Sequence, residues 1–168
     1  MAKRLALYAG TFDPLTIGHL WMIKQGSAMF DKLIVAIGIN PEKQCMFSVK
    51  ERLEMIRKAI KPFSNVELSS FTNKFLISYA QSIGAQFVLR GIRTESDYEY
   101  ERAMRNINSD FNPDITMVFL MPPRGISEIS SSMVKGLIGP EGWEGIVKNY
   151  VPQSVFNKLR EVYLARKK

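Results

Sequence analysis

Five short apolar segments recur along the chain, and longer segments with apolar residues at helical spacing separate them. The apolar segments cover residues 4–8, 33–37, 66–70, 87–89 and 116–120. Several of them are apolar at consecutive positions, which is typical of strands buried on both faces of a sheet. The alternation of strands and helices therefore predicts an α/β protein with a parallel sheet that is covered on both faces.

Capping signals mark where several of the helices begin. Ser48, followed three residues later by Glu51, precedes apolar residues at helical spacing and has the form of a capping box. The acidic segment 94–97 predicts the start of another helix. Further along, we expect a turn-rich loop over 139–145 and a C-terminal helix that begins near Pro152.

The predicted elements place a ligand site at one end of the sheet. We expect a single doubly wound, Rossmann-like domain over residues 1–168, with a five-stranded parallel sheet in the order 3-2-1-4-5 and additional helices at the C-terminus. Such sheets bind ligands outside the carboxyl ends of their strands, where the strand order reverses. That crevice lies between the first and fourth strands, which are followed by residues 10–14 and 90–93.

Composition supports an ordinary globular protein, with 46% hydrophobic and 23% charged residues. A chain of 168 residues is long enough for one domain with a hydrophobic core. The single cysteine, Cys45, cannot form an internal disulfide, and the apolar stretch 5–9 is too short for an export signal or a membrane span. We therefore expect a cytoplasmic protein without a membrane partner.

The formal net charge of +7 suits nucleic acid, an anionic membrane surface or a polyanionic small molecule. More than half of this excess lies in a basic C-terminal tail over residues 158–168, which holds five cations and one acidic residue. Because the charge is concentrated in the tail, the case for a nucleic-acid partner is weak.

The strongest chemical signal is the segment 8–19, in which a strand end leads through a Gly- and Pro-containing loop to a helix that opens at Gly18 and His19. A helix start offers unpaired backbone amides and a partial positive charge, so it suits a phosphate. His19, the only histidine, and the Thr11 hydroxyl could both donate to phosphoryl oxygens. The alternative is a simple turn with a surface histidine; the loop length, the glycines and the position after the first strand favour a functional site.

A second signal is Arg90-Gly91-Ile92-Arg93, which places two guanidinium groups just beyond an apolar strand. The planar fork of arginine suits phosphate oxygens, and a glycine lets a ligand approach the backbone. These arginines could equally pair with the nearby acids Asp97 or Glu101.

Two further segments follow other strands at the same edge of the sheet. Lys43 follows the second strand and could bridge the phosphates of two substrates, although an isolated lysine is more often a solvated surface residue. Residues 129–132 follow the fifth strand, ahead of a short helix expected after Ser132, and their hydroxyls and amides could bind an anion or simply cap the helix.

Several familiar sites are absent from the sequence. It contains no Walker pattern, no Gly-x-Gly-x-x-Gly, no Cys/His metal spacing and no Ser/His/Asp set that one histidine could serve. These absences argue against hydride transfer and zinc-dependent hydrolysis.

The motifs together resemble the bacterial phosphopantetheine adenylyltransferases, a family of the nucleotidyltransferase superfamily, over residues 3–160. The superfamily signature T/H-x-G-H is matched by residues 16–19. The motifs more specific to the family are matched, in order, by residues 10–14, 90–93, 97–101, Asn108, 118–122 and 129–135.

The resemblance implies a reaction of ATP with 4′-phosphopantetheine that gives dephospho-CoA and pyrophosphate, with Mg²⁺, in a homohexamer built as a dimer of trimers. By position, it implies phosphopantetheine contacts from Thr11, Lys43, Leu76, Arg90 and Asn108. It implies ATP contacts from Thr11, Phe12, His19, Gly91, Ile92, Arg93, Glu101, Ile126, Ser127, Glu128, Ile129, Ser130, Ser131 and Ser132. His19 would stabilise the transition state, with Lys43, Thr11 and Arg93 sharing that work; no residue is expected to bind a metal directly.

The chain departs from the family pattern at Ala9, over 73–77, over 125–128 and at Gly136. The changed stretches that face the acceptor leave two other reactions open: adenylyl transfer to a nicotinic acid or nicotinamide mononucleotide, and cytidylyl transfer to a sugar or polyol phosphate. A reading from another class is a basic nucleic-acid-binding or nucleotide-sensing module without turnover.

Overall fold

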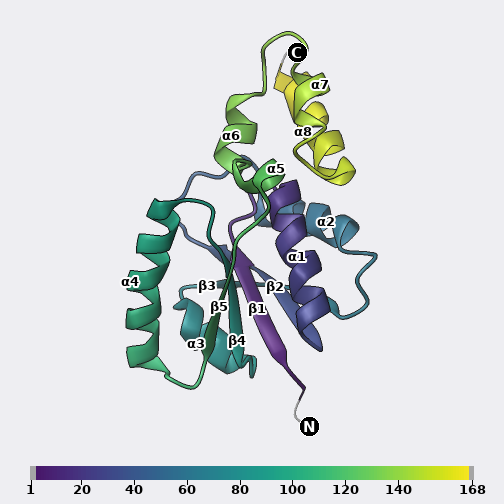
Figure 1. The fold of residues 1–168 in the computed structure, drawn as a ribbon. Helices are drawn as coiled ribbons and strands as arrows, with labels where there is room; N and C mark the ends of the chain where they lie inside the picture. The colour runs from purple at the N-terminus through teal and green to yellow at the C-terminus, as the bar shows by residue number, and fades with distance from the viewer. Residues whose placement is uncertain (1–2, 167–168) are drawn as a thin grey trace.

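The structure, a computed structural model, describes residues 3–166. At its centre lies one parallel sheet of five strands in the order β3-β2-β1-β4-β5 (Figure 1). The strands are β1 (Leu5–Gly10), β2 (Lys32–Ile39), β3 (Val66–Thr72), β4 (Phe87–Gly91) and β5 (Thr116–Leu120). The predicted α/β fold and the predicted strand order are both confirmed.

The first four strands extend two residues further at their carboxyl ends than the apolar pattern predicts. The additional residues include Gly10, Thr72 and Gly91, which pair with neighbouring strands through their backbones. A parallel ladder is made of backbone hydrogen bonds, so a polar residue or a glycine can continue it without an apolar side chain. The extra residues bring the chain up to the edge of the sheet where the candidate site lies.

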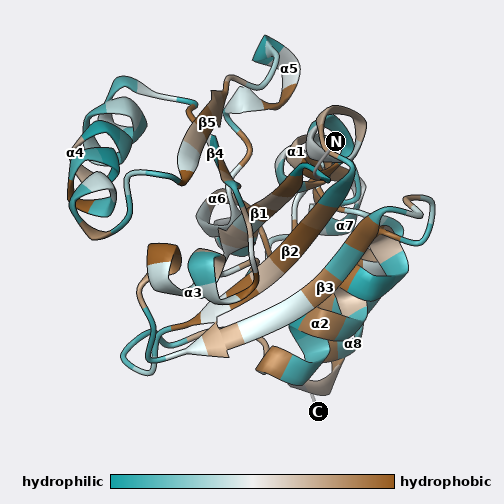
Figure 2. Cartoon of the chain, turned by 90° about the horizontal axis from the view of Figure 1, so that it is seen from below, coloured by the Kyte–Doolittle hydropathy of each residue, from teal (hydrophilic) through white to brown (hydrophobic). Residues whose placement is uncertain are grey.

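Burial follows the position of each strand in the sheet. The middle residues of β1 and β2 are buried on consecutive positions, whereas the edge strands β3 and β5 have no buried position. Figure 2 shows the same contrast, with hydrophobic residues concentrated along β1 and β2. The consecutive apolar runs of β1 and β2 thus mark strands buried on both faces, whereas the apolar run of β5 lies in an edge strand.

Eight helices surround the sheet in the described part of the chain. They are α1 (Ile17–Met29), α2 (Val49–Ala59), α3 (Leu76–Ser82), α4 (Glu95–Phe111), α5 (Arg124–Ser127), α6 (Ser131–Gly136), α7 (Trp143–Val147) and α8 (Gln153–Arg166). On one face of the sheet, Ile23 of α1, Ile56 of α2 and Leu159 of α8 share a core. On the other face, Ile77 and Ala80 of α3 pack with side chains of the central strands.

Helix α4 lies to the side of the sheet and contributes little to either core (Figure 1). Its buried residues are Glu101 and Asn108, and both are polar. Because an apolar side chain would normally fill such positions, two buried polar groups on one helix indicate a site rather than a packing surface.

The capping signals locate the helix starts well. Ser48 and Glu51 form a capping box at α2, Thr94 caps α4, and α8 begins at Gln153. The prediction of a loop over 139–145 is wrong at its end, because α7 begins at Trp143.

Tertiary packing explains α7. Trp143 is buried and contacts the Tyr163 ring edge-on, with the centroids 5.3 Å apart. Burial of this large side chain stabilises a short helix that its glycine-rich sequence does not favour by itself.

The C-terminal residues form part of the packed structure as far as the structure describes them. Residues 158–166 of the expected basic tail lie in α8, where Lys158 pairs with Glu51 and Glu161; Lys167 and Lys168 fall outside the described residues. No helix within residues 3–166 is long and apolar enough to cross a membrane.

Candidate active site

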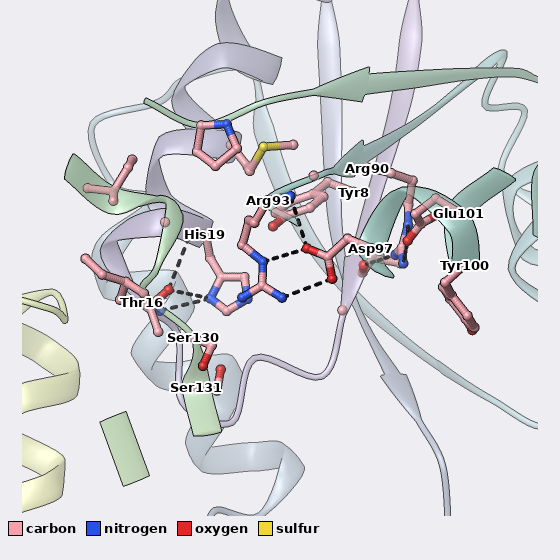
Figure 3. Close-up of a pocket in the computed structure, with 18 residues that line it drawn as sticks. Tyr8, Thr16, His19, Arg90, Arg93, Asp97, Tyr100, Glu101, Ser130 and Ser131 are labelled. Atoms are coloured by element: carbon pink, nitrogen blue, oxygen red, sulfur yellow. Dashed lines mark hydrogen bonds and ion pairs between the residues drawn. The ribbon is translucent and has the colours of Figure 1, made fainter. Parts of the chain in front are cut away.

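A cavity of about 380 Å³, here called the first cavity, opens at the carboxyl ends of β1 and β4, where the strand order reverses. Its walls come from β1, α1, β4, α4 and the segment around α5 and α6 (Figure 3). Of the predicted site residues it is lined by His19, Arg90, Gly91, Arg93, Glu101, Ile126, Ile129, Ser130 and Ser131. The first and fourth strand ends therefore converge on a single space, as the sequence predicts.

The imidazole of His19 is held by the start of its own helix. Thr16 caps α1, and the backbone N–H of Thr16 donates to Nδ1 of His19 at 3.0 Å, with the Thr16 hydroxyl 2.9 Å from the same nitrogen. Since a nitrogen that accepts a backbone hydrogen bond carries no hydrogen, the neutral ring has its hydrogen on Nε2. His19 can thus offer one N–H donor to a ligand in the first cavity.

The surroundings of His19 keep its ring neutral. Burial, helped by the nearby positive charge of Arg93, lowers the pKa of His19 to about 4. Phe12 packs against the ring edge-on, with the centroids 5.1 Å apart. Phe12 is itself buried, and its backbone has a φ of 50°, in the left-handed region. A neutral imidazole of fixed orientation suits the donation of a hydrogen bond rather than proton transfer at neutral pH.

Arg90 lies in the wall of the first cavity and is held by two groups. Its Nε donates to Glu101 Oε1 at 2.9 Å, its Nη2 makes a second contact with the same oxygen, and its Nη1 donates to the carbonyl of Ala9 at 3.1 Å. Glu101 is buried, and a quarter of the Arg90 side chain remains exposed. The guanidinium is therefore oriented before any ligand binds.

Arg93 pairs with Asp97 at the start of α4. Its Nε donates to Asp97 Oδ2 at 3.0 Å, and its backbone N–H donates to the same carboxylate at 3.0 Å. This guanidinium holds the pKa of Asp97 below its usual range, even though partial burial of the carboxyl acts in the opposite direction. Both of the ion pairs that the sequence suggested as alternatives to ligand binding are thus present, and both arginines nevertheless line the cavity.

A second cavity of about 440 Å³ adjoins the first. The two share Ala9, Gly10, Arg90, Tyr100 and Glu101 as a common wall. All five residues expected at phosphopantetheine line the second cavity, namely Thr11, Lys43, Leu76, Arg90 and Asn108. The arrangement provides room for two ligands that meet beside Arg90.

Asn108 contributes an unpaired hydrogen-bond donor to the second cavity. The residue is buried, and its Nδ2 has no hydrogen-bond partner. A buried amide without a partner is costly, and in native structures such a group usually has a functional explanation. A ligand carbonyl in the second cavity would satisfy it.

Asp13 holds together the loops that carry Thr11 and Lys43. Its buried carboxylate accepts from the backbone N–H groups of Met46 and Phe47 at 2.9 and 3.0 Å, and from Lys135 Nζ at 3.1 Å. The sequence analysis did not single out Asp13; its position between Phe12 and Pro14 in a loop next to the predicted site was the available signal.

Six of the predicted ATP-contacting residues do not line the first cavity, and one of them, Thr11, lines the second cavity instead. Phe12 packs behind His19, and Ile92 and Ser127 line a separate cavity beside Met121. Glu128 and Ser132 line neither of the two adjoining cavities. Nearby, Ser130 caps α6 and Ser131 Oγ donates to the carbonyl of Pro14 at 2.8 Å.

Several residues that line the first cavity were not predicted to do so, among them Tyr8 and Asp97. The sequence had suggested Asp97 only as an ion-pair partner for an arginine. Tyr8 lies inside an apolar strand, where the sequence pattern gives no reason to separate it from core residues.

Within residues 3–166, no three His, Cys, Asp or Glu side chains come together as a set that could hold a metal ion.

Comparison with known proteins places the chain in a family. The model of the cytidylyltransferase-like family matches residues 7–137. A phosphopantetheine adenylyltransferase from Chromobacterium violaceum is 57% identical over 158 residues, which cover 94% of this chain and 96% of that protein. One from Caldanaerobacter subterraneus is 39% identical, with 95% and 98% covered.

The fold is similar to that of more distant enzymes. A Plasmodium falciparum nicotinic acid mononucleotide adenylyltransferase complexed with NaAD superimposes with a TM-score of 0.70 at 15% identity, with 97% of both chains covered. At that identity the likeness concerns the fold alone. The high identity to full-length relatives is more specific, and the chain belongs to the phosphopantetheine adenylyltransferase family within the cytidylyltransferase-like proteins.

Proposed function

We propose that this protein transfers the adenylyl group of ATP to 4′-phosphopantetheine, giving dephospho-CoA and pyrophosphate in coenzyme A biosynthesis. The observation that carries the proposal is the pair of adjoining cavities, one beside His19 and Arg93 and the other beside Lys43 and Asn108, which share Arg90 in their common wall. Membership of the phosphopantetheine adenylyltransferase family supports the same reaction.

The first cavity suits the triphosphate of ATP. The neutral His19 ring donates from Nε2, Arg93 supplies a positive charge, and Ser130 and Ser131 line the same cavity. On entry of the nucleotide, Arg93 would divide its donors between Asp97 and the phosphate oxygens, since a guanidinium has five N–H groups. Preorganised donors of this kind stabilise charge that builds up in the transition state.

The second cavity suits an elongated phosphate ester with amide groups. Arg90 and Lys43 would bind the phosphate of the acceptor at the junction, where it meets the nucleotide. The free Nδ2 of Asn108 would donate to an amide carbonyl of the pantetheine arm, and Leu76 would contact its apolar parts. Phosphopantetheine has each of these groups along one chain.

The reaction needs no protein base. A phosphate monoester is mostly dianionic at neutral pH because its second pKa is about 6. One of its nonbridging oxygens attacks the α-phosphorus of ATP, the bond between that phosphorus and the α,β-bridging oxygen breaks, and pyrophosphate leaves with the bonding electrons. Catalysis then consists of in-line positioning and charge stabilisation, to which His19, Thr11, Lys43 and Arg93 contribute. Magnesium would enter bound to the triphosphate of the ATP substrate.

The cellular location and the oligomeric state of the protein also form part of the proposal. We propose that the enzyme works in the cytoplasm and assembles as a homohexamer. Light scattering coupled to size-exclusion chromatography would measure the assembly directly, and a molar mass well below six chains would contradict it.

An acceptor panel tests the proposed reaction. Pyrophosphate release is measured with ATP and 4′-phosphopantetheine, with ATP and nicotinic acid mononucleotide, and with CTP and glycerol 3-phosphate. We expect turnover with the first pair and a kcat/KM at least about 100-fold lower with the other two. Their acceptors lack the amide carbonyls of the pantetheine arm, to which Asn108 would donate, and CTP carries a different base from ATP. Equal or faster turnover with either of the other pairs would overturn the proposal.

A further inference from the structure

Tyr8 is a polar residue of the first cavity to which the proposed mechanism gives no task. It lies near the end of β1, and the strand register places it opposite Leu89, the residue before Arg90. The side chain is 6% exposed and lines the first cavity. A tyrosine here is thus both part of the core and part of the wall of the candidate site.

The hydroxyl of Tyr8 is a free donor. Its ring packs edge-on against Phe12 with the centroids 5.5 Å apart, whereas its oxygen makes no hydrogen bond to any other described residue. The hydroxyl is not one of the fully buried unpaired atoms of the described residues, so it reaches the space of the cavity, where a ligand oxygen can accept from it.

Two positive charges act on this hydroxyl. Figure 3 shows the Tyr8 ring between the side chains of Arg93 and Arg90, and both guanidinium groups act electrostatically on the phenol. Burial nevertheless raises the pKa of Tyr8 well above its ordinary value, so the group remains an O–H donor at neutral pH. Arg93 belongs to the first cavity and Arg90 to the wall shared with the second, so Tyr8 lies where the two substrates would meet.

We propose that the Tyr8 hydroxyl is a further catalytic group, which donates a hydrogen bond to a nonbridging oxygen of the phosphoryl group in transfer. The inference rests on the proposed adenylyl transfer. In the ground state Arg90 and Arg93 bind the two phosphates on either side, and the oxygen between them gains negative charge as the new P–O bond forms. The hydrogen bond from a neutral donor at that place becomes stronger in the transition state. Because the donor carries no charge, it does not add a charge attraction that would slow release of the product.

The variant Tyr8→Phe tests this role, because it removes one oxygen and keeps the ring that packs on Phe12. We expect kcat to fall about 10- to 100-fold, with the KM values for both substrates changed by less than about threefold, since a hydrogen bond to a charged group made mainly in the transition state is lost. The melting temperature should stay close to that of the wild type, because the hydroxyl has no partner in the free protein.

Tyr79→Phe is the matched control. Tyr79 is 7% exposed, lies on α3 away from the first cavity, and its hydroxyl pairs with Ser69 at 2.7 Å. This variant should lose stability and keep its kcat, which is the opposite of the result expected for Tyr8→Phe.

The outcomes separate the two proposals. If the wild type releases no pyrophosphate with ATP and 4′-phosphopantetheine, the proposed function fails. If the wild type is active and the kcat of Tyr8→Phe lies within about fivefold of it, the role of Tyr8 is overturned. The same conclusion follows if the loss appears only in KM, or if Tyr8→Phe loses as much stability as the control.

Discussion

The backbone N–H of Thr16 donates to Nδ1 of His19, so the residue that caps α1 also determines which nitrogen of the imidazole faces a ligand. This is a capping box in which a histidine takes the place usually filled by a glutamate or glutamine. The superfamily signature over residues 16–19 thus contains its own positioning device, since the threonine and the histidine are three residues apart on one turn of helix.

The first prediction concerns the contribution of His19 to catalysis. We expect His19→Ala to lower kcat by about 100- to 1,000-fold while the KM for ATP changes little, because the hydrogen bond from Nε2 strengthens as charge develops in the transition state. Steady-state kinetics with both substrates varied would measure this. An effect confined to KM would remove His19 from the catalytic machinery.

The second prediction concerns the protonation of the same ring. Because the folded-state pKa is about 4 and the unfolded value is 6.5, the unfolded chain binds more protons between these two pH values. The contribution of His19 to stability is therefore fully present above about pH 6.5 and is lost as the pH falls towards 4.

NMR can follow this titration without assignment problems, because His19 is the only histidine of the chain. We expect the imidazole signals to show the Nε2–H tautomer at neutral pH and to titrate with a midpoint near 4. A midpoint close to the ordinary value of 6.5 would contradict a ring that its surroundings keep neutral.

The third prediction concerns the ion pair between Arg90 and Glu101. Glu101→Ala leaves a mostly buried guanidinium without its carboxylate and should lower the free energy of unfolding by about 3 kcal/mol. The exposed pair Arg4–Asp31 provides the control, since solvent screens it and Asp31→Ala should cost much less than Glu101→Ala. Urea unfolding of both variants measures the difference, and equal effects would show that burial of the first pair has no energetic consequence.

The fourth prediction concerns Asn108. Asn108→Leu should raise the KM for the acceptor about tenfold or more, because the amide donor to the pantetheine arm is lost. Its unfolding free energy should be unchanged or higher, since the substitution removes a buried donor that has no partner in the free protein.

Asn106→Leu on the same helix is the control, because Asn106 is exposed and lines neither of the adjoining cavities. This variant should keep the wild-type KM for the acceptor. If both variants raise that KM equally, the effect comes from α4 as a whole and not from the Asn108 amide.

The sequence predicted the fold more completely than it predicted the roles of single residues. Strands buried on both faces must be apolar at consecutive positions, and that pattern located the strands. The order 3-2-1-4-5 was an expectation for a doubly wound sheet, which the structure confirms. The short helix α7 escaped prediction, because the burial of Trp143 and Val147 in the tertiary structure stabilises it.

Some residues of the two cavities were predicted from the sequence, and others became apparent only in the structure. Side chains at or just beyond a strand end, such as Arg90, Lys43 and His19, were identified from sequence because the carboxyl ends of parallel strands share one edge of the sheet. Tyr8 and Asp13 were missed, because one lies within an apolar strand and the other acts through contacts with residues far away in the sequence.

What the sequence determined by itself was the strands, the longer helices and the chemistry available at one edge of the sheet, since these depend on local periodicity and residue type. What only the tertiary structure decided was which donors are already paired. Arg90 is engaged by Glu101, Nδ1 of His19 is engaged by Thr16, and Nδ2 of Asn108 remains free. The physical reason is that a hydrogen bond depends on distances and angles between atoms, and those exist only once the chain has folded.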